Sequence, residues 1–61
     1  MKVKLEKGAT LRQWAEKKAW RRGLRGDKLI AYANILEWSI MKGYSENYAT
    51  TTAEALYIFY V

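Results

Sequence analysis

The segment 28–42, KLIAYANILEWSIMK, constrains this chain more than any other, because ten of its fifteen residues are apolar or aromatic. On a helix with about 100° between residues, one continuous stripe is formed by Leu29, Ala33, Leu36 and Ile40. Four more large apolar side chains lie well outside that stripe: Ile30, Ile35, Trp38 and Met41. A helix that is apolar nearly all round is buried on several sides. We therefore expect a homodimer interface or a hydrophobic partner surface to cover what so short a chain leaves open.

The length and composition predict one small basic domain over residues 1–61. A core of this size is marginal unless disulfides, a metal or a partner subunit supports it. Cysteine and histidine are both absent, so no disulfide can form and the usual nitrogen and sulfur ligands of zinc are missing. The six carboxylates are spread singly, and neither serine has a histidine to activate it. We therefore expect no enzymatic activity, no metal and no cofactor.

Two helices are indicated by their end signals. Thr10 with Gln13 three residues later has the form of a capping box, which predicts a helix over 11–22 that Gly23 ends. Asp27 is the expected N-cap of the second helix, over 28–42, and Gly43 closes it. The first helix buries Ala15 and Ala19, and we place both Trp14 and Trp38 in the core.

Two short strands are expected at the ends of the chain. Residues 1–6 alternate charged and apolar side chains, which is the period of a half-buried strand. The stretch 44–52 is expected to be a loop with one helical turn capped at Thr51 or Thr52, and the following LYIFYV, residues 56–61, has the composition of a strand. The predicted fold class is α+β, in the order strand, helix, helix, strand, with both helices on one face of a short sheet. The alternative is a mostly α chain with a helical tail.

Positive charge is gathered in the first part of the chain. Residues 1–28 carry ten Lys and Arg against three Asp and Glu, a net charge of +7, whereas residues 29–61 carry a net charge of −2. The densest part is 17–28, and its expected binding residues are Lys17, Lys18, Arg21, Arg22, Arg25 and Lys28. Such a field attracts polyanions. Two plainer interpretations are a solvated helix face and cations that complement the carboxyl end of the helix dipole.

Trp20 completes the candidate site. On the predicted first helix it lies opposite the buried face, among polar and basic residues. An exposed tryptophan in that setting stacks on a nucleic-acid base or anchors a protein interface. The alternative is that Trp20 packs under a loop that folds back over it.

The turn between the two helices reads Gly23-Leu24-Arg25-Gly26. A GxxG turn between helices, in the order strand, helix, helix, strand, resembles the nucleic-acid-binding core of KH domains, in which this turn approaches the phosphates. A strand followed by two helices is also similar to the ribbon-helix-helix proteins, whose paired strands would here present Lys2, Lys4 and Glu6 to the major groove. We prefer the simpler interpretation, a glycine-flanked turn between helices.

The leading functional hypothesis is a small, non-enzymatic protein that docks residues 17–28 onto nucleic acid as a homodimer. The alternative is a protein-directed inhibitor or adaptor of the kind mobile elements encode, which binds an acidic surface of a host enzyme through the same basic patch, Trp20 and exposed apolar side chains. Binding of helix 10–25 to an anionic membrane is the weakest of the three interpretations. MKVKLEK lacks the apolar middle of a secretory signal, and the expected location is the cytoplasm.

Overall fold

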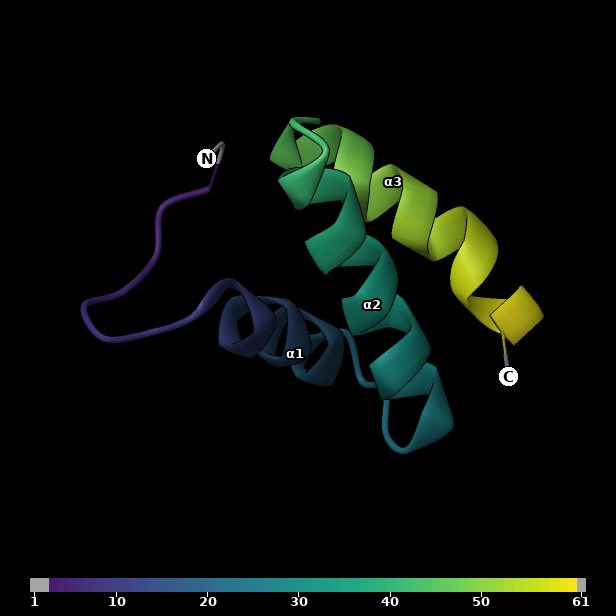
Figure 1. Cartoon of the computed structure of the whole chain (residues 1–61). Helices are drawn as coiled ribbons and strands as arrows, with labels where there is room; N and C mark the ends of the chain where they lie inside the picture. Colours follow the sequence, from purple (N-terminus) through teal and green to yellow (C-terminus); the bar gives the residue numbers. More distant parts are fainter. Residues whose placement is uncertain (1–2, 61) are drawn as a thin grey trace.

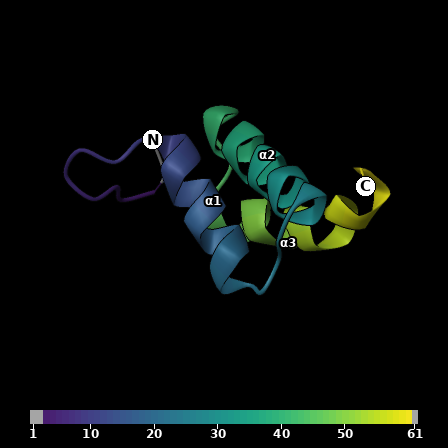
Figure 2. The ribbon, with the colours of Figure 1, turned by 90° about the horizontal axis from the view of Figure 1, so that it is seen from below.

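The computed structural model describes residues 3–60, which form three α-helices and one short 3-10 helix (Figure 1). They are α1 (Leu11–Arg21), α2 (Asp27–Met41), α3 (Glu46–Leu56) and η1 (Tyr57–Tyr60). α2 is central: α1 packs against one side of it, and α3 with η1 packs against another. In the view from below, α1 and α3 lie on neighbouring sides of α2 (Figure 2). Within the described residues, α1 and α3 meet through side chains rather than close backbone packing.

The predicted α+β fold is wrong, because residues 3–60 contain no strand. The alternation in the first residues is nevertheless used: Val3 is buried, Leu5 packs against the core, and Lys4 and Glu6 are exposed. A strand needs a neighbour for its backbone hydrogen bonds, and this arm has none in the described part of the chain. Met1 and Lys2, the start of the expected strand, lie outside the described residues. Without strands, the resemblances to KH domains and to ribbon-helix-helix proteins both fail.

The carboxyl-terminal third is helical where a loop and a strand were expected. Ser45 caps α3, its Oγ accepting a hydrogen bond from Tyr48 N at 3.2 Å. The helix runs on into η1, in which the Tyr57 ring packs edge-on against Tyr32 at 5.5 Å between centroids. Packing against α2 therefore outweighs the strand preference of the tail, since no edge strand is present in residues 3–60 to pair with it. Val61 lies outside the described residues.

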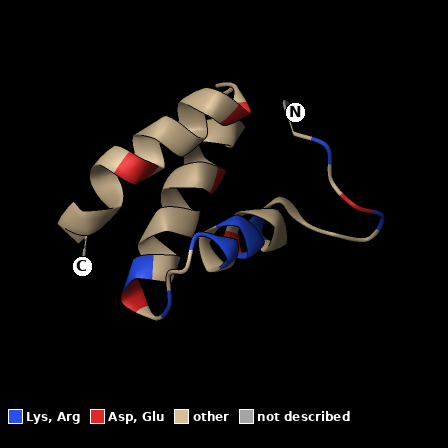
Figure 3. Cartoon of the chain, turned by 180° about the vertical axis from the view of Figure 1, so that it is seen from behind, with Lys and Arg blue, Asp and Glu red and all other residues tan. Residues whose placement is uncertain are grey.

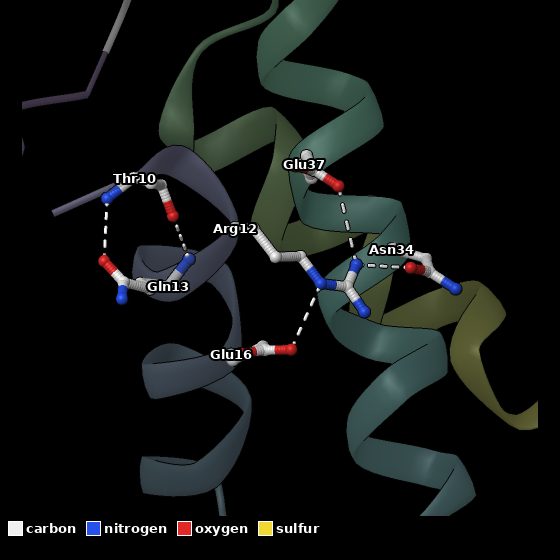
Figure 4. Close-up of polar contacts among 6 residues, drawn as sticks. All are labelled: Thr10, Arg12, Gln13, Glu16, Asn34 and Glu37. Carbon is white, nitrogen blue, oxygen red and sulfur yellow. Dashed lines mark hydrogen bonds and ion pairs between the residues drawn. The ribbon is translucent and has the colours of Figure 1, made fainter.

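Most of the predicted end signals of the first two helices are confirmed. Thr10 Oγ1 accepts from Gln13 N at 3.1 Å, and Gln13 Oε1 accepts from Thr10 N at 2.9 Å, which is the complete capping box (Figure 4). Gly23, just past α1, has a φ of +97°, a conformation that glycine adopts without strain. Asp27 is not an N-cap: Gly26 holds that place with a φ of +62°, and Asp27 is the first residue of α2.

A partly exposed polar network joins α1 to α2. The Arg12 guanidinium pairs with Glu16 Oε2 of its own helix at 3.2 Å and with Glu37 Oε1 of α2 at 3.5 Å. Its Nη1 also donates to Asn34 Oδ1 on α2, so that one side chain ties three groups together (Figure 4). The carboxylates come from two helices, so the network fixes how far α1 can slide along α2.

The core is thin, and alanine supplies much of it. Ala15 and Ala19 of α1, and Ala49 and Ala53 of α3, are completely buried against α2. The described chain measures only 14 Å along its shortest axis, little more than the thickness of one helix. Many large apolar side chains therefore stay at the surface. Trp38, expected in the core, is 55% exposed, whereas Trp14 is partly buried against the core as expected.

None of the helices within residues 3–60 has both the length and the apolar character that a bilayer crossing requires.

Among the buried side-chain polar atoms of residues 3–60, one has no hydrogen-bond partner. Ser39 lies in α2 with no exposed surface, and its Oγ makes no hydrogen bond. An unsatisfied buried hydroxyl costs about 1–3 kcal/mol. Ser45, by contrast, uses its hydroxyl as the α3 cap.

We therefore expect Ser39→Ala to raise the free energy of unfolding by about 1–2 kcal/mol, because it removes the unsatisfied group and improves helix propensity. Ser45→Ala is the matched control and should lower stability by about 1 kcal/mol through loss of the cap. Urea unfolding followed by circular dichroism measures both. A destabilised Ser39→Ala variant would show that this hydroxyl makes a favourable interaction after all.

Candidate nucleic-acid interface

The seven predicted site residues lie on consecutive elements, and Figure 3 shows the Lys and Arg positions along α1, in the turn and at the start of α2. The set begins in the second half of α1, passes through the turn and ends in the first turn of α2; it comprises Lys17, Lys18, Trp20, Arg21, Arg22, Arg25 and Lys28. Asp27 is the one carboxylate of the segment 17–28. The structure then divides these cations into two groups, those that are paired and those that are free.

Two of the cations bridge α1 to α3. Lys18 Nζ lies 3.0 Å from Glu46 Oε2, and Arg22 Nε lies 2.8 Å from Glu54 Oε2. Both carboxylates belong to residues 29–61, which carry the net negative charge. Part of the positive charge of residues 1–28 is therefore neutralised within the chain. Lys18 and Arg22, predicted to face an external partner, bind glutamates of α3 instead. The opposite net charges of residues 1–28 and 29–61 are the sequence signal for this pairing.

Glu54 is the centre of a three-residue network. Its Oε2 accepts from Arg22 Nε and, at 2.9 Å, from the hydroxyl of Tyr32, which is buried on α2. The hydrogen bond from Arg22 holds the pKa of Glu54 below its usual range, and the bond from Tyr32 acts in the same direction. Burial raises the pKa of Tyr32 well above that of an ordinary phenol, and the bond to Glu54 adds to the rise. This network joins all three α-helices.

A third cation holds the amino-terminal arm. Lys17 Nζ lies 3.2 Å from Glu6 Oε1, and both side chains are largely exposed. A hollow of about 270 Å³ lies beside this pair, between the arm and α1. Its lining brings together the cations Lys4, Lys17, Lys18 and Arg21 with the carboxylates Glu6 and Glu46. Lys4 was not among the expected site residues, because its place beside α1 depends on how the arm folds back.

Arg25 forms hydrogen bonds within the α1–α2 turn that contains it. Its Nη1 donates to the backbone oxygens of Trp20 at 3.0 Å and Leu24 at 2.6 Å, so it satisfies carbonyls at the end of α1. The guanidinium also lies over the Trp20 ring, 4.2 Å from its centroid. Trp20 is 56% exposed, as its position on the helix predicts, and no loop covers it. Arg25 and Trp20 thus form an exposed cation–aromatic pair.

Arg21 and Lys28 are the free cations of the predicted set. Both are exposed, and neither makes an ion pair with a carboxylate of residues 3–60. Arg25 likewise makes no ion pair there. The three lie at the end of α1, in the turn and at the start of α2. The arrangement therefore concentrates unneutralised positive charge around the α1–α2 turn.

Comparisons with protein-family models, with curated proteins and with solved structures give no significant match. Within residues 3–60, no three carboxylate, imidazole or thiol side chains gather as a metal site would require. The exposed groups of the site are cations and one aromatic ring, which suit the binding of anions.

The Glu54 network predicts how stability depends on pH. A carboxyl group whose pKa is lower in the folded chain stabilises the fold above its unfolded pKa and loses that contribution as the pH falls through the folded value. We expect the free energy of unfolding of the wild type to decline as the pH falls below about 4. Glu54→Gln should show a shallower decline between pH 6 and pH 3, measured by urea unfolding.

Tyr32→Phe serves as the control for that series. It removes one hydrogen bond to Glu54 and leaves Arg22 in place, so it should keep the larger part of the acid dependence. It should also remove the loss of stability that ionisation of Tyr32 causes above about pH 10. Equal pH profiles for the wild type and Glu54→Gln would contradict the network.

Proposed function

We propose that this chain is a small, non-enzymatic cytoplasmic protein that binds the nucleic-acid backbone with the end of α1 and the α1–α2 turn. The observation that carries the proposal is the set of three exposed cations without a carboxylate partner in the described chain, Arg21, Arg25 and Lys28, beside the half-exposed Trp20. Phosphates would bind these three cations, as glutamate carboxylates bind other cations of α1. The Trp20 ring offers a surface on which a base can stack.

The paired cations form a second group of contacts. Surface ion pairs are worth about 0–1 kcal/mol, so Lys17 and Lys18 can exchange their glutamates for phosphates at little cost. Arg22 is held more firmly, since Glu54 also binds Tyr32. Three cations therefore bind phosphate directly, and two more can join them on a long enough strand.

Base-specific recognition by an inserted helix is not part of this proposal. α2 and α3 are joined by a four-residue turn that contains Gly43, a connection similar in length to that of helix-turn-helix motifs. In that arrangement α3 would enter the major groove, but α3 carries Glu46 and Glu54 and no Lys or Arg. Phosphates would repel it. The positive charge lies at the opposite end of the connected helices, which favours contacts to the backbone.

A second candidate function has one observation in its favour. Three cations of this face already bind carboxylates in the folded chain, namely Lys17, Lys18 and Arg22, so the face would also accept an acidic protein surface. This is the chemistry that a protein-directed inhibitor or adaptor requires. Capture from cell lysate with and without nuclease separates the two functions, because a protein ligand remains bound after nuclease treatment and a nucleic acid does not.

The salt dependence of duplex binding tests the leading proposal. Each phosphate contact contributes about −0.9 to the slope of log affinity against log salt. With Arg21, Arg25 and Lys28 as the contacts, we expect a slope of about −3, and a slope near −5 if all six predicted cations take part. The double variant Arg21→Ala, Lys28→Ala should bring the slope to about −1 and weaken binding at least about tenfold at low salt.

Lys7→Ala is the matched control, because Lys7 is exposed and makes no ion pair within residues 3–60, and it precedes α1, at the opposite end of that helix from the turn. It should change duplex affinity by less than about twofold. Arg22 and Arg25 are not used in this test, since both hold the fold through Glu54 and the α1 carbonyls. A flat salt dependence of the wild type, or an equal effect of Lys7→Ala, would overturn the proposal.

A further inference from the structure

An apolar groove lies along α2 on the side that faces α3 and η1. It encloses about 710 Å³, and its lining combines Ile30, Ile35 and Trp38 of α2 with Leu56 of α3 and Tyr60 of η1. Trp38 is 55% exposed and Tyr60 is 67% exposed. Ile35 is buried, but nothing within the described residues covers Trp38 or Tyr60, so the groove presents an unpartnered apolar surface.

We propose that this groove and the adjoining outer face of α2 bind a second copy of the same chain, in an antiparallel α2-to-α2 arrangement about a two-fold axis at Asn34. The proposal does not depend on nucleic-acid binding. Its first support is the pattern of the outer face of α2, which comprises Asp27, Ile30, Asn34, Trp38 and Met41. The pattern is symmetric about Asn34. In each direction the next residue of the face is four positions away, Ile30 or Trp38, and the one after it is three positions further, Asp27 or Met41.

This symmetry makes the face self-complementary. When two such helices lie antiparallel with Asn34 opposite Asn34, Ile30 of one copy lies opposite Trp38 of the other. The large exposed tryptophan thus meets a smaller apolar residue, and the polar residue meets its own equivalent. A two-fold interface needs one patch that matches itself in this way.

The area of the patch suits a dimer. An aromatic side chain covers about 150–250 Å² when fully buried, so Trp38 and Tyr60 at their exposures leave about 250 Å². Ile30, Met41 and Leu56 are also exposed and bring the apolar patch to about 500 Å². With its polar rim, this approaches the roughly 800 Å² that each partner contributes to a standard interface. For so small a protein, an apolar patch of this size is costly to leave in water.

Charge favours the same partner and orientation. The chain carries a net charge of +5, so two copies repel each other unless they meet away from their cations. No Lys or Arg lines the groove, and its one charged residue is Asp27 at the start of α2. Arg12 reaches the proposed axis, where it donates to Asn34, but it is paired there with Glu16 and Glu37. At the other end of α2, Lys42 packs against Trp38, with its Nζ 5.6 Å from the ring centroid. Antiparallel pairing brings Asp27 of one copy beside Lys42 of the other, and it leaves both α1–α2 turns at the outside.

Sedimentation equilibrium without nucleic acid tests the dimer directly. We expect the wild type to have twice its chain mass of 7.1 kDa. Trp38→Glu should weaken self-association at least about tenfold, whereas Trp20→Glu, at an equally exposed tryptophan of the basic face, should leave it unchanged. Circular dichroism confirms that both variants keep their helices.

Two further variants test the orientation. Asp27→Lys should weaken the dimer, and adding Lys42→Asp should restore it, because the two charges are exchanged together. The chain has no cysteine, so Asn34→Cys introduces a single thiol on the proposed axis, which should form a disulfide-linked dimer under mild oxidation. Asn47→Cys, at an exposed position of α3, is the control and should form little.

A wild-type chain that stays at 7.1 kDa at millimolar concentration would overturn the proposal and leave the groove to a different protein. Equal loss of association in Trp38→Glu and Trp20→Glu would also overturn it. Because these measurements contain no nucleic acid, they succeed or fail separately from the salt-dependence test of the basic face.

Discussion

The fold depends on the close packing of two alanine-bearing helices, α1 and α3, against neighbouring sides of α2. Ala15 and Ala19 on α1, and Ala49 and Ala53 on α3, have no exposed surface and let each helix approach α2 closely. Small contact residues bury little apolar area, and Leu36 is the one large apolar side chain of the described chain that is fully buried. A molecule built in this way has a narrow core and retains much of its apolar side-chain surface outside it.

Electrostatics compensates where packing is sparse. α1 and α3 are too far apart for backbone contact, and Lys18 and Arg22 span the gap to glutamates of α3. The cations that this framework does not use lie around the α1–α2 turn, while the apolar side chains that it cannot bury lie along α2 and η1. The narrow core and the ion pairs between α1 and α3 thus leave two exposed surfaces of different chemistry. One is a cationic surface at the α1–α2 turn, and the other is an apolar groove between α2 and η1.

Local signals were sufficient for the first two helices and for the position of Trp20. The Thr10 box, Gly23 and the apolar stripe of α2 each act within a turn or two of helix, which sequence spacing captures directly. The strand predictions were wrong because they rested on local alternation and composition, whereas a strand exists only beside another strand. Ser45 was the overlooked signal: it caps α3 and turns the expected loop and strand into a helix.

The sequence by itself determined one helix that begins at a capping box, a second helix with more apolar surface than the chain can cover, and a strongly positive first part. Only the tertiary structure decided which cations are free and which apolar residues stay exposed. The reason is distance along the chain: Lys18 and Glu46 are 28 residues apart, and Arg22 and Glu54 are 32. Whether such residues meet depends on where α3 packs, and that depends on the shape of the whole core rather than on any short segment.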